Sequence, residues 1–454
     1  MQSFFKKLKL LVAFAVFLTA YSQAQEKQPE TVSFTLQQAI DYAFQNQASV
    51  LNSAIDNEIA QKKINELIGI GLPQINGTAS AQRFLRIPTQ VIPAAALGGP
   101  EGVAVPAQFS LEYQASAGLE ATQLIFDGSY MVGIQATKTY AELSRKNYQQ
   151  SKIETAAAVS KAYYGVLVNT ERFDLLNTNI ERVRKLKDDT RALLDNGFVE
   201  KIDYDRVEVT YNNILAEKTK TEKLLELGKA LLKFQMGMDA DATLILSDNL
   251  KNIAFDEALP AESKADPAQR IEYSILQTTH RLQELDLKKN RFQYFPNLSL
   301  FGGLSTYAYR FEFDFLESSE KWYPTAVIGA TLSVPIFDGM QKRARIQQSK
   351  LNLKKIENNF RSLEQGILFE TQTAKAKLEN AIVSLEIQRK NRELAGNVAR
   401  VTKIKYEQGV GLNTEVVDAE TALKEAETNY YSALFDALVA KTDYAKATGT
   451  LLKN

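Results

Sequence analysis

The sequence predicts a mainly α-helical chain of long antiparallel coiled-coil hairpins, with four β-strands that contribute to a transmembrane β-barrel. Three observations predict this fold: long stretches without proline, a repeat of the whole pattern, and strands in which apolar and polar residues alternate. An export signal at the N-terminus is consistent with it.

The first residues have the composition of a secretory signal peptide, which we assign to residues 1–24. Lys6, Lys7 and Lys9 precede a short apolar run, and Ser22 and Ala24 place small residues where a signal peptidase inspects them. The apolar run is shorter than the about 20 residues of a spanning helix, although a retained anchor is the alternative. Residues 26–30 then form a polar lead-in.

Composition excludes several classes of function. The chain has no cysteine, one histidine, and 54 acidic against 54 basic residues. It therefore has no disulfide framework, thiolate metal site or cysteine nucleophile, and its balanced charge does not favour nucleic acid as a partner. No phosphate-binding glycine loop or serine-hydrolase motif occurs. We expect no enzymatic activity, no cofactor and no required metal.

Two proline-free stretches predict the helices. No proline lies between residues 107 and 259 or after 335, and a proline inside a helix costs about 3 kcal/mol. Each stretch is interrupted by glycine, at Gly197 and Gly409, and glycine supplies the left-handed residue that ends many helices. The helices expected on these grounds cover residues 129–196, 201–236, 340–408 and 413–448.

The last of these helices indicates how they pack. Spacings of three and four alternate along it, as in a coiled coil. The residues of this seam are Val416, Ala419, Leu423, Ala426, Tyr430, Ala433, Ala437, Ala440, Tyr444 and Ala447. Two antiparallel helices joined by a short turn would form each hairpin, although a soluble bundle uses the same seam.

The pattern occurs twice along the chain. Ile125-Phe126-Asp127-Gly128 recurs 211 residues later as Ile336-Phe337-Asp338-Gly339, and the two turn glycines are 212 residues apart. We therefore divide the mature chain into a first repeat, a linker and a second repeat. Their ranges are 25–238, 239–266 and 267–454.

Each repeat places a helix and two strands before its long helix. The strands are expected at about 73–83, 108–126, 296–315 and 325–337. Apolar and polar residues alternate almost strictly in the second of these, and the fourth repeats the alternation in phase. Gly302 and Gly303 shift the alternation, as a β-bulge would. Trp322 and Tyr323 fit a membrane-interface girdle.

Such alternation fits either a half-buried soluble sheet or a membrane barrel. The barrel is favoured because the polar face has no evident core partner, the strands are long and the chain is exported. Four strands cannot close a transmembrane barrel, since the smallest have eight, and open edges in hydrocarbon leave backbone groups unpaired. The barrel must be shared, and two, three or four copies would satisfy this argument.

Together the repeat, the strand pairs and the long hairpins resemble the TolC-like outer membrane efflux protein family. The most specific parts are the doubled Ile-Phe-Asp-Gly, the turn from Tyr406 to Leu412, and Glu415-Val416-Val417-Asp418-Ala419. The resemblance implies a homotrimer with a shared 12-stranded barrel and an α-helical tunnel that extends from the outer membrane into the periplasm. It implies outer membrane lipid, a periplasmic adaptor (membrane fusion) protein and an inner-membrane pump as partners.

The function implied is that of a passive duct, the outer-membrane component of a tripartite efflux or type I secretion system. The adaptor and the pump would open it. A secreted coiled-coil scaffold or adhesin without transport activity is the alternative. The strand pairs lie between helices in each repeat, which argues against an adhesin with a single terminal barrel segment.

The resemblance also assigns roles near the turns. It places Asp203, Glu415 and Asp418 in an acidic ring at the periplasmic entrance, where threefold symmetry would gather like charges and favour cations. Acidic residues are favoured near helix N-termini in any case, so solvated helix residues are the alternative. Tyr406 matches a contact that holds the entrance closed, or else packs in the seam.

The turns themselves would meet the adaptor. The adaptor-facing residues are Gly197, Phe198, Gly409, Val410, Gly411 and Leu412. The second turn fits the family's Val-Gly-Leu pattern, and the first departs from it.

Overall fold

The computed structural model describes residues 32–250, 266–317 and 320–452, which form two compact units. Of the described residues, one unit contains 32–51, 152–250 and 371–452, and the other contains 52–151, 266–317 and 320–370. Each unit therefore takes segments from both sequence repeats. The predicted signal peptide (1–24), the lead-in and residues 251–265 of the predicted linker lie outside the described residues.

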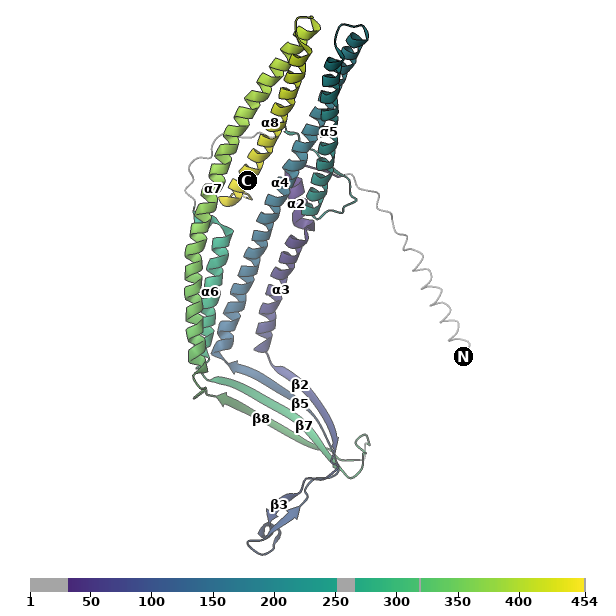
Figure 1. The fold of residues 1–454 in the computed structure, drawn as a ribbon. Coiled ribbons are helices and arrows are strands. Elements are labelled where there is room, and N and C mark those ends of the chain that lie inside the picture. Colours follow the sequence, from purple (N-terminus) through teal and green to yellow (C-terminus); the bar gives the residue numbers. More distant parts are fainter. Residues whose placement is uncertain (1–31, 251–265, 318–319, 453–454) are drawn as a thin grey trace, which may run out of the picture. The chain divides into compact units, whose positions relative to one another are not determined.

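Long helices dominate the chain, as the sequence predicts. Helix α4 is continuous over Gly128–Asp195, and α7 is continuous over Gln341–Glu407. Their shorter neighbours are α5 over Lys201–Met236 and α8 over Asn413–Ala447. Figure 1 shows α4 joined to α5, and α7 to α8, by short turns. Within the described ranges, no helix has both the length and the apolar character needed to cross a membrane.

The first unit contains a small parallel sheet that the sequence did not reveal. Strand β1, Val32–Phe34, pairs with β6, Leu244–Leu246, which lies inside the predicted linker. Tyr163 of α4 is fully buried beside them. Its hydroxyl lies 2.9 Å from the carbonyl oxygen of Phe34 and 2.8 Å from Asp248 Oδ2. The described start of the linker is therefore held to β1 by strand pairing and to α4 by the hydrogen bond from Tyr163.

Two helices precede the sheet region where one was predicted. Helix α2 covers Leu36–Asn46 and α3 covers Ala48–Ile70. The break lies at Gln47, whose backbone is extended and whose side-chain oxygen accepts from the N–H of Ser49 at 2.7 Å. Gly237 ends α5 against this break, because a Cβ at Gly237 would lie 2.4 Å from the carbonyl oxygen of Asn46.

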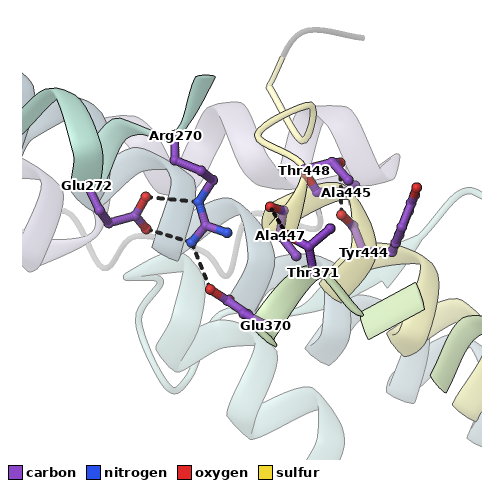
Figure 2. Close-up of polar contacts among 8 residues, drawn as sticks. All are labelled: Arg270, Glu272, Glu370, Thr371, Tyr444, Ala445, Ala447 and Thr448. Atoms are coloured by element: carbon purple, nitrogen blue, oxygen red, sulfur yellow. Dashed lines mark hydrogen bonds and ion pairs between the residues drawn. The ribbon is translucent and has the colours of Figure 1, made fainter. Parts of the chain in front are cut away.

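The seam predicted on α8 is confirmed by burial. Every predicted seam residue is buried except Tyr430 and Tyr444, which are half-buried. The end of α8 is also attached to α7, since Thr371 Oγ1 donates to the carbonyl oxygen of Ala447 at 3.2 Å (Figure 2).

The second unit contains an antiparallel sheet of four strands in the order β2-β5-β7-β8. The strands are β2, Gln74–Arg83; β5, Tyr113–Phe126; β7, Asn297–Arg310; and β8, Tyr323–Ser333. Helix α3 leads into β2, and α6, Ile271–Phe292, leads into β7 (Figure 1). A short ribbon of β3, Gln90–Pro93, and β4, Ala104–Ala107, lies between β2 and β5.

The start of α6 is held by a buried charge. Arg270 precedes the helix, and its guanidinium lies 3.0 Å from carboxylate oxygens of both Glu272 and Glu370 (Figure 2). Arg270 is only 5% exposed, so these partners compensate for the loss of its hydration.

Three strands are shorter than predicted, and in two of them the neighbouring strand sets the limit. The strand expected from 108 begins at Tyr113, opposite Arg83, where β2 ends. The strand expected to reach 337 ends at Ser333, opposite Asn297, where β7 begins. Alternation continues in the sequence beyond these points, but the ladders stop there, apart from one bond from the N–H of Phe84 to the carbonyl oxygen of Glu112 at 2.7 Å.

The third strand was expected to reach 315 and ends at Arg310. The side chain of Arg310 is buried, donates to the carbonyl oxygen of Lys321 at 2.7 Å and pairs with Asp314 at 3.1 Å. These contacts fold the following loop back, so that Phe315 is buried whereas Phe311 remains exposed.

The bulge predicted at Gly302 and Gly303 is wrong. Both glycines pair in continuous register with β5 and β8, and the irregularity lies between Leu124 and Phe126. The alternation changes because Phe301 lies on the polar face and covers Gly329. A Cβ at Gly329 would lie 2.5 Å from the Phe301 ring.

The two faces of the sheet differ in polarity. The register places Ile75 beside Ala121, Leu119 beside Leu304, and Gly302 beside Ile328. The opposite face carries Gln74, Asn76, Thr78, Ser80, Ser116, Glu120, Thr122, Ser305, Thr325, Thr331 and Ser333. Leu119 and Ile328 are 58% and 88% exposed, so in a single chain the apolar face has no covering layer over them.

Candidate functional site at the helix turns

Both helix turns have the same backbone structure. Gly197 and Gly409 adopt left-handed φ values of 76° and 73°. The N–H of Gly197 donates to Leu194 and that of Phe198 to Leu193, each at 2.9 Å. In the second turn, the corresponding bonds run from Gly409 to Tyr406 and from Val410 to Lys405, each at 3.0 Å. This pair of hydrogen bonds, together with a left-handed glycine, satisfies carbonyl groups at the helix end and reverses the chain.

Gly411 is needed for a different reason. A Cβ at this position would lie 2.9 Å from the backbone nitrogen of Tyr406 and 3.1 Å from the Lys405 carbonyl carbon. The turn therefore requires a residue without a side chain where the chain passes back over the helix end.

The turns place apolar side chains in solvent. Phe198 and Val410 occupy equivalent positions of the two repeats, and each is 78% exposed. Leu412 is exposed as well. Although the first turn departs from the sequence pattern of the second, both present a large apolar side chain at the same place.

A side chain joins the two turns. Asn413, the first residue of α8, is buried, and its Nδ2 donates to the backbone carbonyl oxygen of Asp203 at 2.8 Å. The carboxylate of Asp203 accepts from the N–H of Glu200 at 3.4 Å, near the start of α5. Asn413 was not among the predicted residues, because a polar residue that begins a helix is common and does not reveal a distant partner.

Glu415 and Asp418 lie on the exposed side of the first two turns of α8. Across the described ranges, neither carboxylate forms an ion pair or a side-chain hydrogen bond, and no group of three acidic, histidine or cysteine residues is placed to hold a metal. The structure thus links Asp203 to α8 through Asn413 but does not bring the three acidic side chains together within one chain.

Tyr406 packs at the base of the second turn. Its ring lies against a buried apolar cluster formed by Leu176, Ile180, Val183, Leu186, Val207, Ile214 and Val416. Its hydroxyl is buried, and no hydrogen-bond partner for it exists among the described residues. The ring therefore packs in this cluster, while the oxygen has no hydrogen-bond partner among the described residues.

Among the polar contacts between α4 and α8 farther from the turns, two involve glutamates of α8. Arg182 pairs with Glu420 at 2.8 Å, and Asn179 Nδ2 donates to Glu427 Oε2 at 2.7 Å. Both glutamates are buried. Burial raises the pKa of Glu427, and the bond from Asn179 and the nearby Arg182 oppose the rise only in part.

Sequence reasoning did not identify these contacts as important. The available signal was the spacing of Glu420 and Glu427, which are seven residues apart and each follow a seam alanine, at Ala419 and Ala426. Such positions border a coiled-coil interface and often carry pairing charges. The partner helix was not predictable, because it belongs to the other hairpin.

Comparison with known proteins gives a family match over most of the chain. Residues 39–226 and 276–450 match the family described as outer membrane efflux protein. The outer membrane protein TolC of Escherichia coli (strain K12) is 20% identical over 344 residues, which cover 74% of this chain and 69% of the relative.

Solved structures have the same fold at low sequence identity. A structure of CusC superposes with a TM-score of 0.73 at 15% identity, covering 94% of this chain and 95% of that one. The open state of the MtrE outer membrane channel of Neisseria gonorrhoeae gives a TM-score of 0.72 at 20% identity, covering 92% of this chain and 89% of the channel.

Proposed function

Because this chain belongs to the outer membrane efflux protein family, we propose that three copies form one passive duct through the outer membrane into the periplasm. Membership in the family makes the chain an outer membrane efflux channel with a helical periplasmic part, and not an enzyme, as the sequence predicts. Channels of this family form trimers in efflux assemblies. The trimer of this particular chain and its partners are the proposal.

The open edges of the four-stranded sheet are the observation that supports it. Among the described residues, β2 and β8 each pair with a neighbour on one side only, and they contain 10 and 11 residues. In hydrocarbon each unpaired backbone group would cost several kcal/mol. Edges of similar length can remove this cost by pairing β2 of one copy with β8 of the next.

The number of copies follows from the family. Two, three or four copies of four strands would all reach the minimum of eight strands. Three copies give a 12-stranded barrel, which agrees with the trimers of related channels. The apolar face of the sheet would meet lipid, and the polar face would line the bore.

The partners are assigned to the helix turns. The exposed Phe198 and Val410 offer apolar contacts to a periplasmic adaptor, which would connect the duct to an inner-membrane pump that supplies the energy. Each of the three copies would contribute Asp203, Glu415 and Asp418 to a ring of acidic side chains at the entrance, and this ring would favour cations. Tyr406 would contribute to the contact that holds the entrance closed.

Disulfide scanning tests the shared barrel. The chain has no native cysteine, so Ser80→Cys on β2 can be combined in turn with Tyr323→Cys, Thr325→Cys, Val327→Cys or Thr331→Cys on β8. Within one chain, two strands separate these positions, about 14 Å at the usual strand spacing. A disulfide needs Cα atoms within about 7 Å, so it can form only between copies.

We expect at least one pairing to give a covalent trimer and no larger species on a non-reducing gel. Ser80→Cys alone is the control and should remain a monomer there. Monomers for all four pairings, or a ladder that continues beyond three copies, would contradict the closed ring. A planar-bilayer recording of the uncrosslinked trimer separates a duct, which passes ions, from a scaffold or adhesin, which does not.

A further inference from the structure

Positive charge is concentrated where the second repeat passes between sheet and helices. The last two turns of α6 and the first two turns of α7 carry six basic residues, which we call the basic collar: Lys288, Lys289, Arg291, Lys342, Arg343 and Arg345. Over residues 286–297 and 334–347, the acidic residues are Asp286 and Asp338. Neither the duct nor the turns account for this charge.

Side-chain contacts hold the two helix ends together. Asn290 Nδ2 donates to Ser349 Oγ at 2.9 Å, and Ser349 Oγ lies 2.7 Å from Asp286 Oδ2. Lys342 Nζ lies 5.6 Å from the centre of the Tyr294 ring. Figure 1 shows the ends of α6 and α7 side by side where they meet β7 and β8. The six cations therefore lie at one end of two helices that are packed together.

Most of this charge is not neutralised. Lys342 pairs with Asp338 at 3.5 Å. The other five side chains are exposed, and no ion pair involves them within the described part of the chain. The one polar side-chain contact among the five joins Arg345 to the neutral Gln293, 3.5 Å away.

The helix ends make part of this arrangement unfavourable. Basic residues suit the C-terminus of α6, but Lys342 and Arg343 lie in the first turn of α7, where the helix dipole favours negative charge. An external anion would relieve both this conflict and the repulsion within the patch.

The first repeat shows that the repeated architecture does not require the charge. Its junction has no lysine or arginine in residues 64–82 or 114–137. With the 211-residue offset, Lys342, Arg343 and Arg345 correspond to apolar residues. These are Met131, Val132 and Ile134.

The position of the collar indicates what kind of anion it meets. Tyr294, Phe295 and Phe337 are exposed aromatic residues beside it, and the sheet begins at Asn297. Aromatic girdles of membrane-spanning sheets lie at the level of the lipid headgroups. Because the helical part is periplasmic, this junction lies at the periplasmic leaflet of the outer membrane. The most abundant anionic groups there are the phosphates of the lipid headgroups.

We propose that the basic collar binds the headgroups of anionic phospholipids in the periplasmic leaflet, with one site in each protomer. Arginine pairs with phosphate oxygens through two parallel hydrogen bonds, and lysine adds a mobile point charge. The proposal rests on the duct described above for its membrane level and for the number of three sites per channel. Junctions with and without the basic collar would then alternate around the trimer.

The test compares lipid retained by the channel in nanodiscs of phosphatidylcholine with a minor fraction of phosphatidylglycerol. Native mass spectrometry counts the phosphatidylglycerol that remains bound. For the wild type we expect three bound phosphatidylglycerol molecules per trimer. For Lys289→Gln/Arg343→Gln/Arg345→Gln we expect the bound lipid to contain phosphatidylglycerol in nearly the same proportion as the nanodisc. Each removed charge should weaken binding roughly fivefold, and added salt should weaken the wild type in the same direction.

A matched control lies on the same helix farther from the sheet. Lys350→Gln/Lys354→Gln/Lys355→Gln also removes three exposed lysines from α7 and should keep the bound lipid. Equal retention by the collar variant and the wild type would overturn the proposal, and so would equal loss in the control. Bound phosphatidylglycerol on a channel that is not a trimer would count against the duct and not against the collar.

Discussion

Asn413 Nδ2 donates a hydrogen bond to the backbone carbonyl oxygen of Asp203 at 2.8 Å, which fixes the first turn of α8 to the first turn of α5. The two hairpins are therefore joined beside their turns, at the end that we propose as the entrance. This bond crosses 210 residues of sequence, and it places one of the predicted acidic residues in a structural role through its backbone.

Removal of this bond should loosen the turns. Asn413→Ala is expected to destabilise the channel by about 1 kcal/mol, because it removes the hydrogen bond from the Asn413 side chain to Asp203. Asn413→Asp should be worse, since a carboxylate would face that carbonyl. Thermal unfolding of the purified trimer measures both, with the half-buried neighbour Thr414→Ala as the control. Equal stability of Asn413→Ala and the wild type would remove Asn413 from this role.

The acidic ring predicts a divalent-cation effect. Glu415→Ala/Asp418→Ala should reduce the block of single-channel current by divalent cations, because each substitution removes three charges from the narrow entrance of the trimer. Asp436→Ala, an exposed residue of α8 far from the turn, should leave the block unchanged. An undiminished block in the double variant would return both residues to the role of solvated helix residues.

Tyr406→Phe separates packing from gating. The ring keeps its apolar contacts and only the buried hydroxyl without a partner is lost, so stability should stay within about 1 kcal/mol. If the hydroxyl serves contacts between hairpins in the closed entrance, the bilayer current should rise. Tyr406→Ala should lose about 3–5 kcal/mol, because it opens a cavity in the cluster. Unchanged current in Tyr406→Phe would restrict Tyr406 to packing.

Glu427 predicts a pH dependence of stability. Its pKa is raised in the fold, above the ordinary value of 4.5, so the folded chain binds this proton more tightly than the unfolded chain does. The ionised Glu427 therefore lowers the stability of the fold at pH values above the raised pKa. This loss of stability is relieved as the pH falls through the raised pKa toward 4.5. Glu427→Gln should remove this contribution, so that the stability difference between variant and wild type shrinks on acidification.

The control for Glu427 is Glu425→Gln, an exposed carboxylate on the same helix. The melting temperatures of the two variants and the wild type should be compared over the same pH series. A difference between Glu427→Gln and the wild type that stays constant with pH would contradict a raised pKa.

Substitution of the exposed apolar residues at the two helix turns should reduce export and leave the channel intact. Phe198→Ser and Val410→Ser should keep the trimer and its bilayer current, because neither side chain contributes to a buried cluster. They should lower export in cells, since apolar contacts with the adaptor are lost. Leu85→Ser, an exposed apolar residue of the other unit, is the control. Normal export in the double variant Phe198→Ser/Val410→Ser would exclude these tips as the docking contact.

Local sequence determined the helices, the turns and the two faces of the sheet. The absence of proline allowed α4 and α7 to continue, Gly197 and Gly409 supplied the left-handed residues that end them, and alternation assigned Leu119 and Ile328 to one face. Each of these is a property of neighbouring residues, either the permitted φ or the period of side chains along the chain.

Only the tertiary structure decided the pairings. β1 with β6, Glu420 with Arg182 and Asn413 with Asp203 join segments that are far apart in sequence. The ends of β5 and β8 depend on where their neighbours stop, and alternation cannot report that. A local pattern states which side chains must be buried or paired, but the partner is set by the packing of the whole chain, because burial and hydrogen bonding depend on distance in space.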